Sequence, residues 1–194
     1  NPTAQGCAGR LKRYVRHITK ILHLEEDGWL YEIAAMLSQL GCLTIPPEVL
    51  TKYATGGTLS DSEKEMVENH PSVAAKFLMH IPRLEEVIEM IAHQGKPYSQ
   101  FPKYSAQANY ARVHLGAQIL HMGLDLDRLL MIGIPPGKAL LQLQKKTEEY
   151  NPALVESLQS FDFGLENMIR MNSTCVGLNT RMILDEDIYT TTGI

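Results

Sequence analysis

The sequence has few cysteines, few aromatic residues and no long apolar run. Its three cysteines, Cys7, Cys42 and Cys175, lie far apart, which argues against a disulfide framework and against a zinc site made of paired cysteines. We expect Cys42 and Cys175 to be small core residues, because their neighbours are apolar. No run approaches the roughly 20 apolar residues that span a bilayer, and no signal-peptide pattern is present. The sequence therefore predicts a cytoplasmic protein with no membrane partner.

Neither positive nor negative charge predominates in the sequence. The 194 residues carry 18 Lys+Arg and 22 Asp+Glu, a formal net charge of -4, so we expect no nucleic-acid partner. At 44% hydrophobic residues the chain can bury a core, and its length suits one ordinary domain. Because the chain starts at Asn1 and stops at Ile194 in mid-pattern, we expect it to be part of a longer protein.

Most of the chain has helical periodicity. Over 10–24, apolar residues recur at i, i+3 and i+4, and the basic residues between them, such as Arg10 and Arg16, are predicted to form a solvated face. A second helix is predicted over 29–40, with Gly41 as its left-handed cap. A capping box, Ser60 to Glu63, predicts a helix from there to about His80. A short helical turn is predicted before it, at 48–50. The remaining helices are predicted over 83–92, 106–122, 125–132, 138–149 and 152–158.

After Phe161 the pattern changes, and 168–171 and 182–188 are predicted as short strands. The predicted fold class is therefore all-α: a helical bundle over residues 1–160, followed by a small β-containing tail over 161–194 that we expect to be truncated.

Common catalytic motifs are missing. The seven histidines include no His-Asp pair and no His-Glu-x-x-His, and His17 and His114 are predicted to have ordinary structural roles. The glycine-rich segment 55–58 lacks the Gly-Lys-Ser/Thr ending of a nucleotide-binding loop, and no Gly-x-Ser-x-Gly elbow occurs. Nothing intrinsic to the sequence predicts nucleophilic catalysis.

One segment of the sequence resembles the signature of a known protein family. Residues 34–50 read Ala-Ala-Met-Leu-Ser-Gln-Leu-Gly-Cys-Leu-Thr-Ile-Pro-Pro-Glu-Val-Leu. They resemble the HD-GYP family signature Ala-Ala-x-Leu-His-Asp-x-Gly-Lys-x-x-Ile-Pro-x-x-x-Leu. The resemblance continues at 57–60 and 81–84, at 70–78 (the family's His-Pro-x-x-Gly-x-x-x-Leu) and at 115–120 (Leu-Gly-Ala-Arg-Ile-Leu). Residues 182–189 also resemble a segment that often follows such domains.

The resemblance implies an HD-type helical bundle. The family hydrolyses cyclic-di-GMP at a bi- or trinuclear iron-type centre and is commonly joined to a response-regulator receiver domain. Here, however, the His-Asp pair falls on Ser38-Gln39, and its following lysine falls on Cys42. The upstream histidine falls near Cys7, and the family's Gly-Tyr-Pro is absent.

Further ligand positions are also changed. The paired histidines fall on Gln94-Gly95, just after His93, and the next acid and arginine fall on Lys96-Pro97. A later aspartate falls on Leu124, although Asp127 matches a second aspartate. Of the metal ligands, only His70 remains in register, so we predict no catalytic residues, no bound metal and no cofactor. The remaining neutral pocket is predicted to contain Ser38, Gln39, His70, His93, Gln94 and Asp127.

Three hypotheses follow. The first is a catalytically inactive HD-GYP-like output domain of a bacterial two-component signalling protein, joined to an upstream receiver or sensor domain and acting through a protein partner or a homodimer. The second is a sensor that binds cyclic-di-GMP without cleaving it, with contacts from Lys96, Tyr98, Lys103 and Tyr104. The third is a residual hydrolase that uses His70, His93 and Asp127.

A related family of inactive His-Asp-output domains also fits the loss of ligands. The register of Pro46, Leu59 and the His70-Pro71 pair favours the HD-GYP branch.

Overall fold

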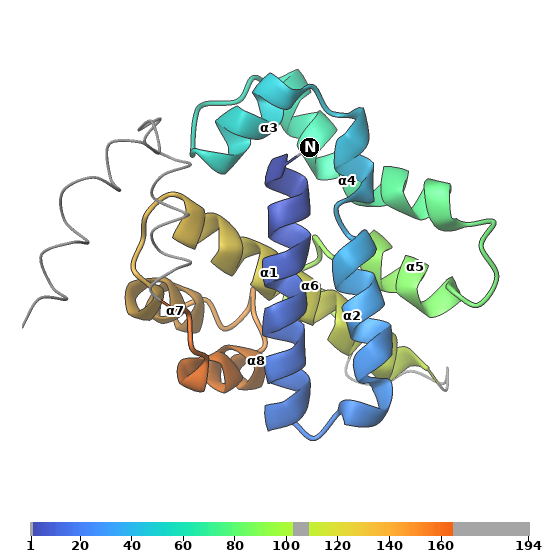
Figure 1. Cartoon of the computed structure of the whole chain (residues 1–194), viewed down its shortest axis with the longest axis vertical. Helices are drawn as coiled ribbons and strands as arrows, with labels where there is room; N and C mark the ends of the chain where they lie inside the picture. The colour runs from blue at the N-terminus through green and yellow to red at the C-terminus, as the bar shows by residue number, and fades with distance from the viewer. Residues whose placement is uncertain (1, 103–108, 165–194) are drawn as a thin grey trace, which may run out of the picture.

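The structure, a computed structural model, describes residues 2–102 and 109–164. This part of the chain contains α-helices and short 3₁₀ helices and no strand, which confirms the all-α fold class. The α-helices are α1 (Pro2–Ile21), α2 (Gly28–Leu37), α3 (Pro47–Ala54), α4 (Asp61–Leu78), α5 (Glu85–Ala92), α6 (Tyr110–Met131), α7 (Pro136–Gln144) and α8 (Pro152–Ser157) (Figure 1). The 3₁₀ helices are η1 (Glu25–Asp27), η2 (Leu40–Thr44), η3 (Tyr98–Gln100) and η4 (Leu158–Ser160). The predicted strands at 168–171 and 182–188 lie outside the described residues.

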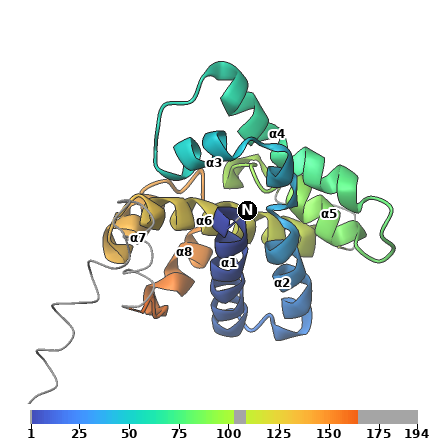
Figure 2. The same ribbon diagram turned by 45° about the horizontal axis from the view of Figure 1, so that its top comes forward.

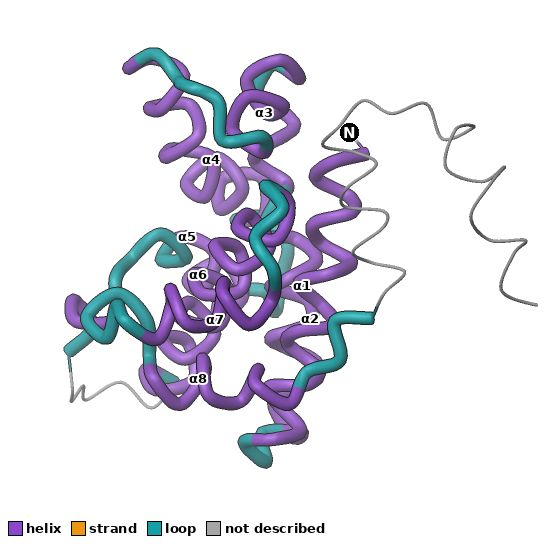
Figure 3. The backbone as a smooth tube through the Cα atoms, turned by 90° about the vertical axis from the view of Figure 1, so that its left-hand side faces the viewer, coloured by secondary structure: helices purple, strands orange, loops and turns teal. Residues whose placement is uncertain are grey.

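The core consists of two apolar clusters of unequal size. The large cluster joins α1, α2, the second half of α4 and α5 to α8 around the long helix α6, and residues such as Leu11, Ile18 and Leu126 are fully buried in it. A small cluster under α3 contains Cys42, Ile45, Val49, Leu50 and Val67. In Figure 3, α3 and α4 lie together at one end of the bundle. Cys42 is therefore a core residue, as its neighbours predict.

The predicted capping box begins α4. Ser60 Oγ accepts from the Glu63 N–H at 3.3 Å, and Glu63 Oε2 accepts from the Ser60 N–H at 2.8 Å. Each side chain satisfies a backbone donor that the first turn leaves free. The capping-box prediction is confirmed, and α4 ends at Leu78, two residues before the predicted end.

Gly41 does not form the predicted left-handed cap. It lies inside η2 and is not among the glycines with positive φ. A Cβ atom at Gly41 would overlap the backbone carbonyl of His70. The glycine is needed here because η2 approaches the backbone of α4 very closely, not because of its own dihedral angles.

Three predicted helix limits are also wrong. The first helix begins at Pro2 rather than at residue 10, because proline is well tolerated at a helix start and the helix continues through Gly6 and Gly9. The predicted break between 122 and 125 is absent, and α6 continues through Gly123, where a Cβ atom would overlap Leu11. The helix predicted over 138–149 ends at Gln144. In the described part of the chain, no helix has both the length and the apolar character needed to span a membrane.

Candidate functional site

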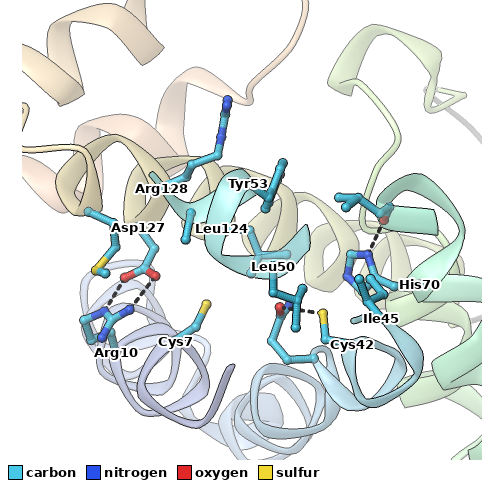
Figure 4. A pocket seen from close by; sticks show the side chains of 14 residues that line it. Cys7, Arg10, Cys42, Ile45, Leu50, Tyr53, His70, Leu124, Asp127 and Arg128 are labelled. Atoms are coloured by element: carbon cyan, nitrogen blue, oxygen red, sulfur yellow. Dashed lines mark hydrogen bonds and ion pairs between the residues drawn. The ribbon is translucent and has the colours of Figure 1, made fainter. Parts of the chain in front are cut away.

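A cavity of about 100 Å³ lies between the large and small apolar clusters. We call it the inner pocket (Figure 4). Four residues that the sequence resemblance predicts at metal-ligand positions line it, namely Cys7, Gln39, His70 and Leu124. The fold therefore brings these four predicted positions together around one cavity. The complete lining is Cys7, Arg10, Gln39, Cys42, Ile45, Leu50, Tyr53, Ala54, Val67, His70, Leu124, Asp127, Arg128 and Met131.

An ion pair crosses one side of the inner pocket. Arg10 Nε donates to Asp127 Oδ1 at 2.5 Å, and a terminal Arg10 nitrogen donates to Asp127 Oδ2 at 2.9 Å. The Asp127 side chain is 5% exposed and that of Arg10 is 21% exposed. Both carboxylate oxygens are thus engaged by a cation that belongs to the protein itself. The prediction of a solvated Arg10 was wrong, since Arg10 lies one turn after Cys7 on the face of α1 that reaches the pocket.

The orientation of His70 depends on the proline that follows it. In a regular helix the N–H of residue 71 would donate to the Val67 carbonyl, but Pro71 has no N–H. His70 Nδ1 lies 2.5 Å from this free Val67 carbonyl and donates to it. The imidazole is therefore the Nδ1–H tautomer, and its Nε2 presents a lone pair on the opposite side of the ring.

Gln94 engages that lone pair. Its Nε2 lies 3.1 Å from His70 Nε2 and 3.3 Å from the Ser38 carbonyl oxygen, so the amide donates to both. Burial lowers the pKa of His70, which keeps the ring neutral at neutral pH. The imidazole nitrogen that would face a metal thus accepts a hydrogen bond from the protein instead.

The side chains that replace the His-Asp pair also bond to one another. Ser38 Oγ donates to the Ala35 carbonyl at 2.9 Å, and Gln39 Nε2 lies 3.5 Å from Ser38 Oγ. Cys42 Sγ lies 3.4 Å from Gln39 Oε1. This part of the site is polar, neutral and internally hydrogen-bonded.

Burial disfavours the thiolate form of both cysteines in the inner pocket. Burial, followed by the negative charge of Asp127, raises the pKa of Cys7 well above its ordinary value. Burial raises the pKa of Cys42 to about 11. Metal binding and nucleophilic attack need the thiolate, which is scarce at neutral pH for both residues.

This donor set does not fit the metal centre that the resemblance implies. Such a centre needs several imidazoles and carboxylates around adjacent cations. Across residues 2–102 and 109–164, no three His, Cys, Asp or Glu side chains converge in a way that could hold a metal ion. His70 and Asp127 both line the pocket, but each is already bonded to a protein group. We therefore derive no metal-dependent step from it.

A second, larger cavity of about 560 Å³ adjoins the inner pocket and shares His70, Tyr53 and Arg128 with it. We call it the outer cleft. Gln94 lines it and is 2% exposed, and its Oε1 atom accepts no hydrogen bond from the described residues. Lys64 adds a second cation to the lining. Glu68 and Asp125 also line the outer cleft, and Arg128 lies 3.4 Å from Asp125, so the cleft offers one free buried acceptor within a lining of balanced charge.

Several predicted site residues lie elsewhere. His93 Nδ1 bonds to the Glu89 carbonyl at 2.9 Å, and the ring is 6.2 Å from that of His114, so His93 lines neither cavity. Lys96 lies 5.2 Å from the centroid of the Phe101 ring. Tyr98 lines a different cavity, and Lys103 and Tyr104 lie outside the described residues. The charged and aromatic residues predicted after Gln94 therefore line neither the inner pocket nor the outer cleft where the structure describes them.

Other residues of the site were missed. Arg10, Tyr53 and Arg128 all line the inner pocket. The spacing of Arg10 to Cys7, and of Arg128 to Leu124, is one helical turn in each case, which was the available signal. His17, in contrast, has the expected structural role, with Nε2 3.0 Å from the Ser157 carbonyl.

Comparison with known proteins agrees with this geometry. A family model described as the HD domain matches residues 1–154. Comparisons with curated proteins and with solved structures gave no match. The match covers most of the chain and all of the elements that line the inner pocket. The chain therefore belongs to the HD domain family.

Proposed function

We propose that this chain is a catalytically inactive HD domain of the HD-GYP type, which acts in bacterial signalling by binding rather than by hydrolysis. One observation carries the proposal. Atoms that would face a metal are engaged by protein groups: His70 Nε2 by Gln94, and both oxygens of Asp127 by Arg10. The pocket keeps its place in the fold, while its chemistry is that of a hydrogen-bonded core.

Electrostatics supports the same conclusion. A di-metal hydrolase brings two cations close together and needs carboxylates to hold them and to lower the pKa of the bridging water. The family's bridging aspartate is replaced here by Gln39, which is neutral. The Asp127 carboxylate already faces the Arg10 guanidinium, and a metal cation beside this pair would be repelled by Arg10.

The signalling role rests on the resemblance. HD-GYP domains are commonly output domains that follow a receiver domain, and a domain that has lost its catalytic centre still transmits a signal through contacts. We therefore propose a cytoplasmic output domain, controlled by an upstream receiver or sensor domain, that works through a protein partner or through self-association.

One titration tests the proposal. Cyclic-di-GMP is added to the purified chain in a calorimeter with Mn²⁺ present, and the iron and manganese content of the protein is measured in parallel. We expect far less than one metal ion per chain and no sustained heat of turnover. Stoichiometric iron or manganese together with continuous heat would overturn the proposal.

The outer cleft supports a second candidate, a receptor that binds cyclic-di-GMP without cleaving it. The free Gln94 Oε1 atom can accept from a ligand N–H or O–H, and Arg128 and Lys64 can attract phosphate. The same titration distinguishes this candidate, because it predicts a saturable isotherm without turnover. Binding should weaken at least tenfold in Arg128→Ala and stay unchanged in the control Lys20→Ala, on the far end of α1.

A further inference from the structure

An apolar stripe runs along one side of α4. It consists of Met66, Val73 and Phe77, and we call it the α4 stripe. At 100° per residue these positions fall within about 40° of one another around the helix. Met66 is 45% exposed and Phe77 is 50% exposed, whereas Val73 is half-buried. The spacing of seven and then four residues is that of a helix seam that packs on another helix.

The α4 stripe lies beside the buried face of α4, not on it. Val67, Ala74 and Leu78 form that buried face, and the main neighbours of α4 are η2 and α5. In Figure 2, α4 runs along the outer edge of the molecule, and no labelled helix lies over its outer side. The stripe is therefore available to a second helix.

Charge along α4 indicates which partner fits. Glu65 directly precedes Met66, and Lys76 directly precedes Phe77. The two charged side chains therefore lie on the same side of the α4 stripe, one at each end. Both are exposed, and neither forms an ion pair with a residue in the described part of the chain. The acidic charge lies toward the start of α4 and the basic charge toward its end. An antiparallel copy of the same helix presents the opposite order.

We propose that the α4 stripe is a homodimer interface in which two copies of α4 pack antiparallel. The two-fold axis passes near Ser72, so that Met66 of each copy contacts Phe77 of the other. Glu65 of each copy then lies within one turn of the partner's Lys76, and the interface contains two such pairs. A two-fold interface requires this kind of self-complementary surface. The inference names the partner in the proposed function and rests on that function for its signalling role.

The test measures self-association of the full chain by sedimentation equilibrium, without nucleotide. We expect a reversible monomer–dimer equilibrium in the wild type. Glu65→Lys places two pairs of lysines across the interface, and Lys76→Glu places two pairs of glutamates. Each variant alone should raise the dimer dissociation constant by roughly tenfold.

Mixing the two variants tests the antiparallel register. In a heterodimer of Glu65→Lys with Lys76→Glu, both interface pairs again join opposite charges, so the mixture should dimerise about as tightly as the wild type. Glu68→Lys is the matched control: it is also exposed on α4 but lies about 160° around the helix from Met66, and it should leave the equilibrium unchanged. Circular dichroism and urea unfolding confirm that each variant folds.

Several results would overturn the proposal. These are a wild type that remains monomeric at about 200 µM, a dimer insensitive to both charge reversals, and a mixture no tighter than either variant alone. If the wild type is monomeric, the α4 stripe would instead contact a different protein or another segment of this chain. The outcome is independent of metal content and of nucleotide turnover, so it can fail while the proposed function stands, and the reverse also holds.

Discussion

Two side chains, Gln94 and Arg10, satisfy the polar atoms of His70 and Asp127 at the inner pocket. Removing ligands from a metal centre would leave buried polar atoms with no partner, which costs free energy. In this chain Gln94 satisfies His70 Nε2, and Arg10 satisfies Asp127. Pro71 has no N–H and so leaves the Val67 carbonyl free. This carbonyl accepts from His70 Nδ1 and thereby orients the imidazole. Gln94, Arg10 and Pro71 together thus leave no polar atom of the His70 ring or the Asp127 carboxylate without a protein partner.

The Arg10–Asp127 pair can be tested by a double-mutant cycle. Asp127→Ala leaves a largely buried guanidinium without its partner, and it should lower the free energy of unfolding by about 3 kcal/mol. Replacing both residues, as Arg10→Met and Asp127→Leu, should recover most of this loss because no charge stays buried. Urea unfolding measures both values. A loss below about 0.5 kcal/mol in Asp127→Ala would show that the pair is effectively solvated.

Residue roles were predicted unevenly from the sequence. Alignment with the family motif correctly placed Gln39 and His70 in one pocket, because the motif positions are fixed by the helices that carry them. Arg10 was missed because periodicity shows which face of a helix is apolar and does not show that a basic side chain at its edge reaches a buried carboxylate. Such a contact joins residues 117 positions apart, so no local pattern contains it.

At the scale of elements, the close approach of η2 to α4 controls the pocket, since Cys42 on η2 and His70 on α4 both line it. Gly41 permits this approach. Gly41→Ala should lower the free energy of unfolding by about 2–3 kcal/mol, because the new methyl group meets backbone atoms that have little room to move.

A matched glycine provides the control for this effect. Gly9 is exposed in α1 and has no heavy atom near the position of a Cβ, so Gly9→Ala should raise the free energy of unfolding by about 0.5–1 kcal/mol. Urea unfolding should therefore show a lower free energy of unfolding for Gly41→Ala and a higher one for Gly9→Ala, each relative to the wild type. Equal effects in both would mean that helix propensity, and not the contact between η2 and α4, determines the result at Gly41.

Helix limits show where local patterns were sufficient. The start of α4 was predicted correctly because a capping box is a local hydrogen-bond motif. The continuity of α6 was not predicted, because Gly123 weakens helix propensity locally, and its reason for being there is contact with Leu11 on another helix. Tertiary contacts thus overrode local preference in α6.

For the whole molecule, the bundle was predictable and the chemistry of its cavity was only partly so. Apolar periodicity in 3.6-residue steps is sufficient for an all-α fold, and the family match confirms the HD domain family, the broader part of the predicted resemblance. The charge balance inside the pocket depends on which side chains meet across α1, α4 and α6, and this follows from packing. The Arg10 guanidinium beside Asp127 and the Gln94 amide beside His70 are therefore features of the inner pocket that no local pattern predicts.

A metal-independent fold is the last expectation, and it concerns the whole molecule. An HD domain that bound Mn²⁺ with a dissociation constant near 1 µM would gain about 4 kcal/mol at 1 mM metal, which raises Tm by roughly 8–16 °C for a chain of this size. Because Arg10 and Gln94 already satisfy the pocket, we expect Tm to differ by less than about 1 °C between EDTA and Mn²⁺. Differential scanning calorimetry measures the shift, and Gly9→Ala serves as a folded control. A metal-dependent rise of several degrees would contradict the proposed neutral pocket, whatever the activity of the protein.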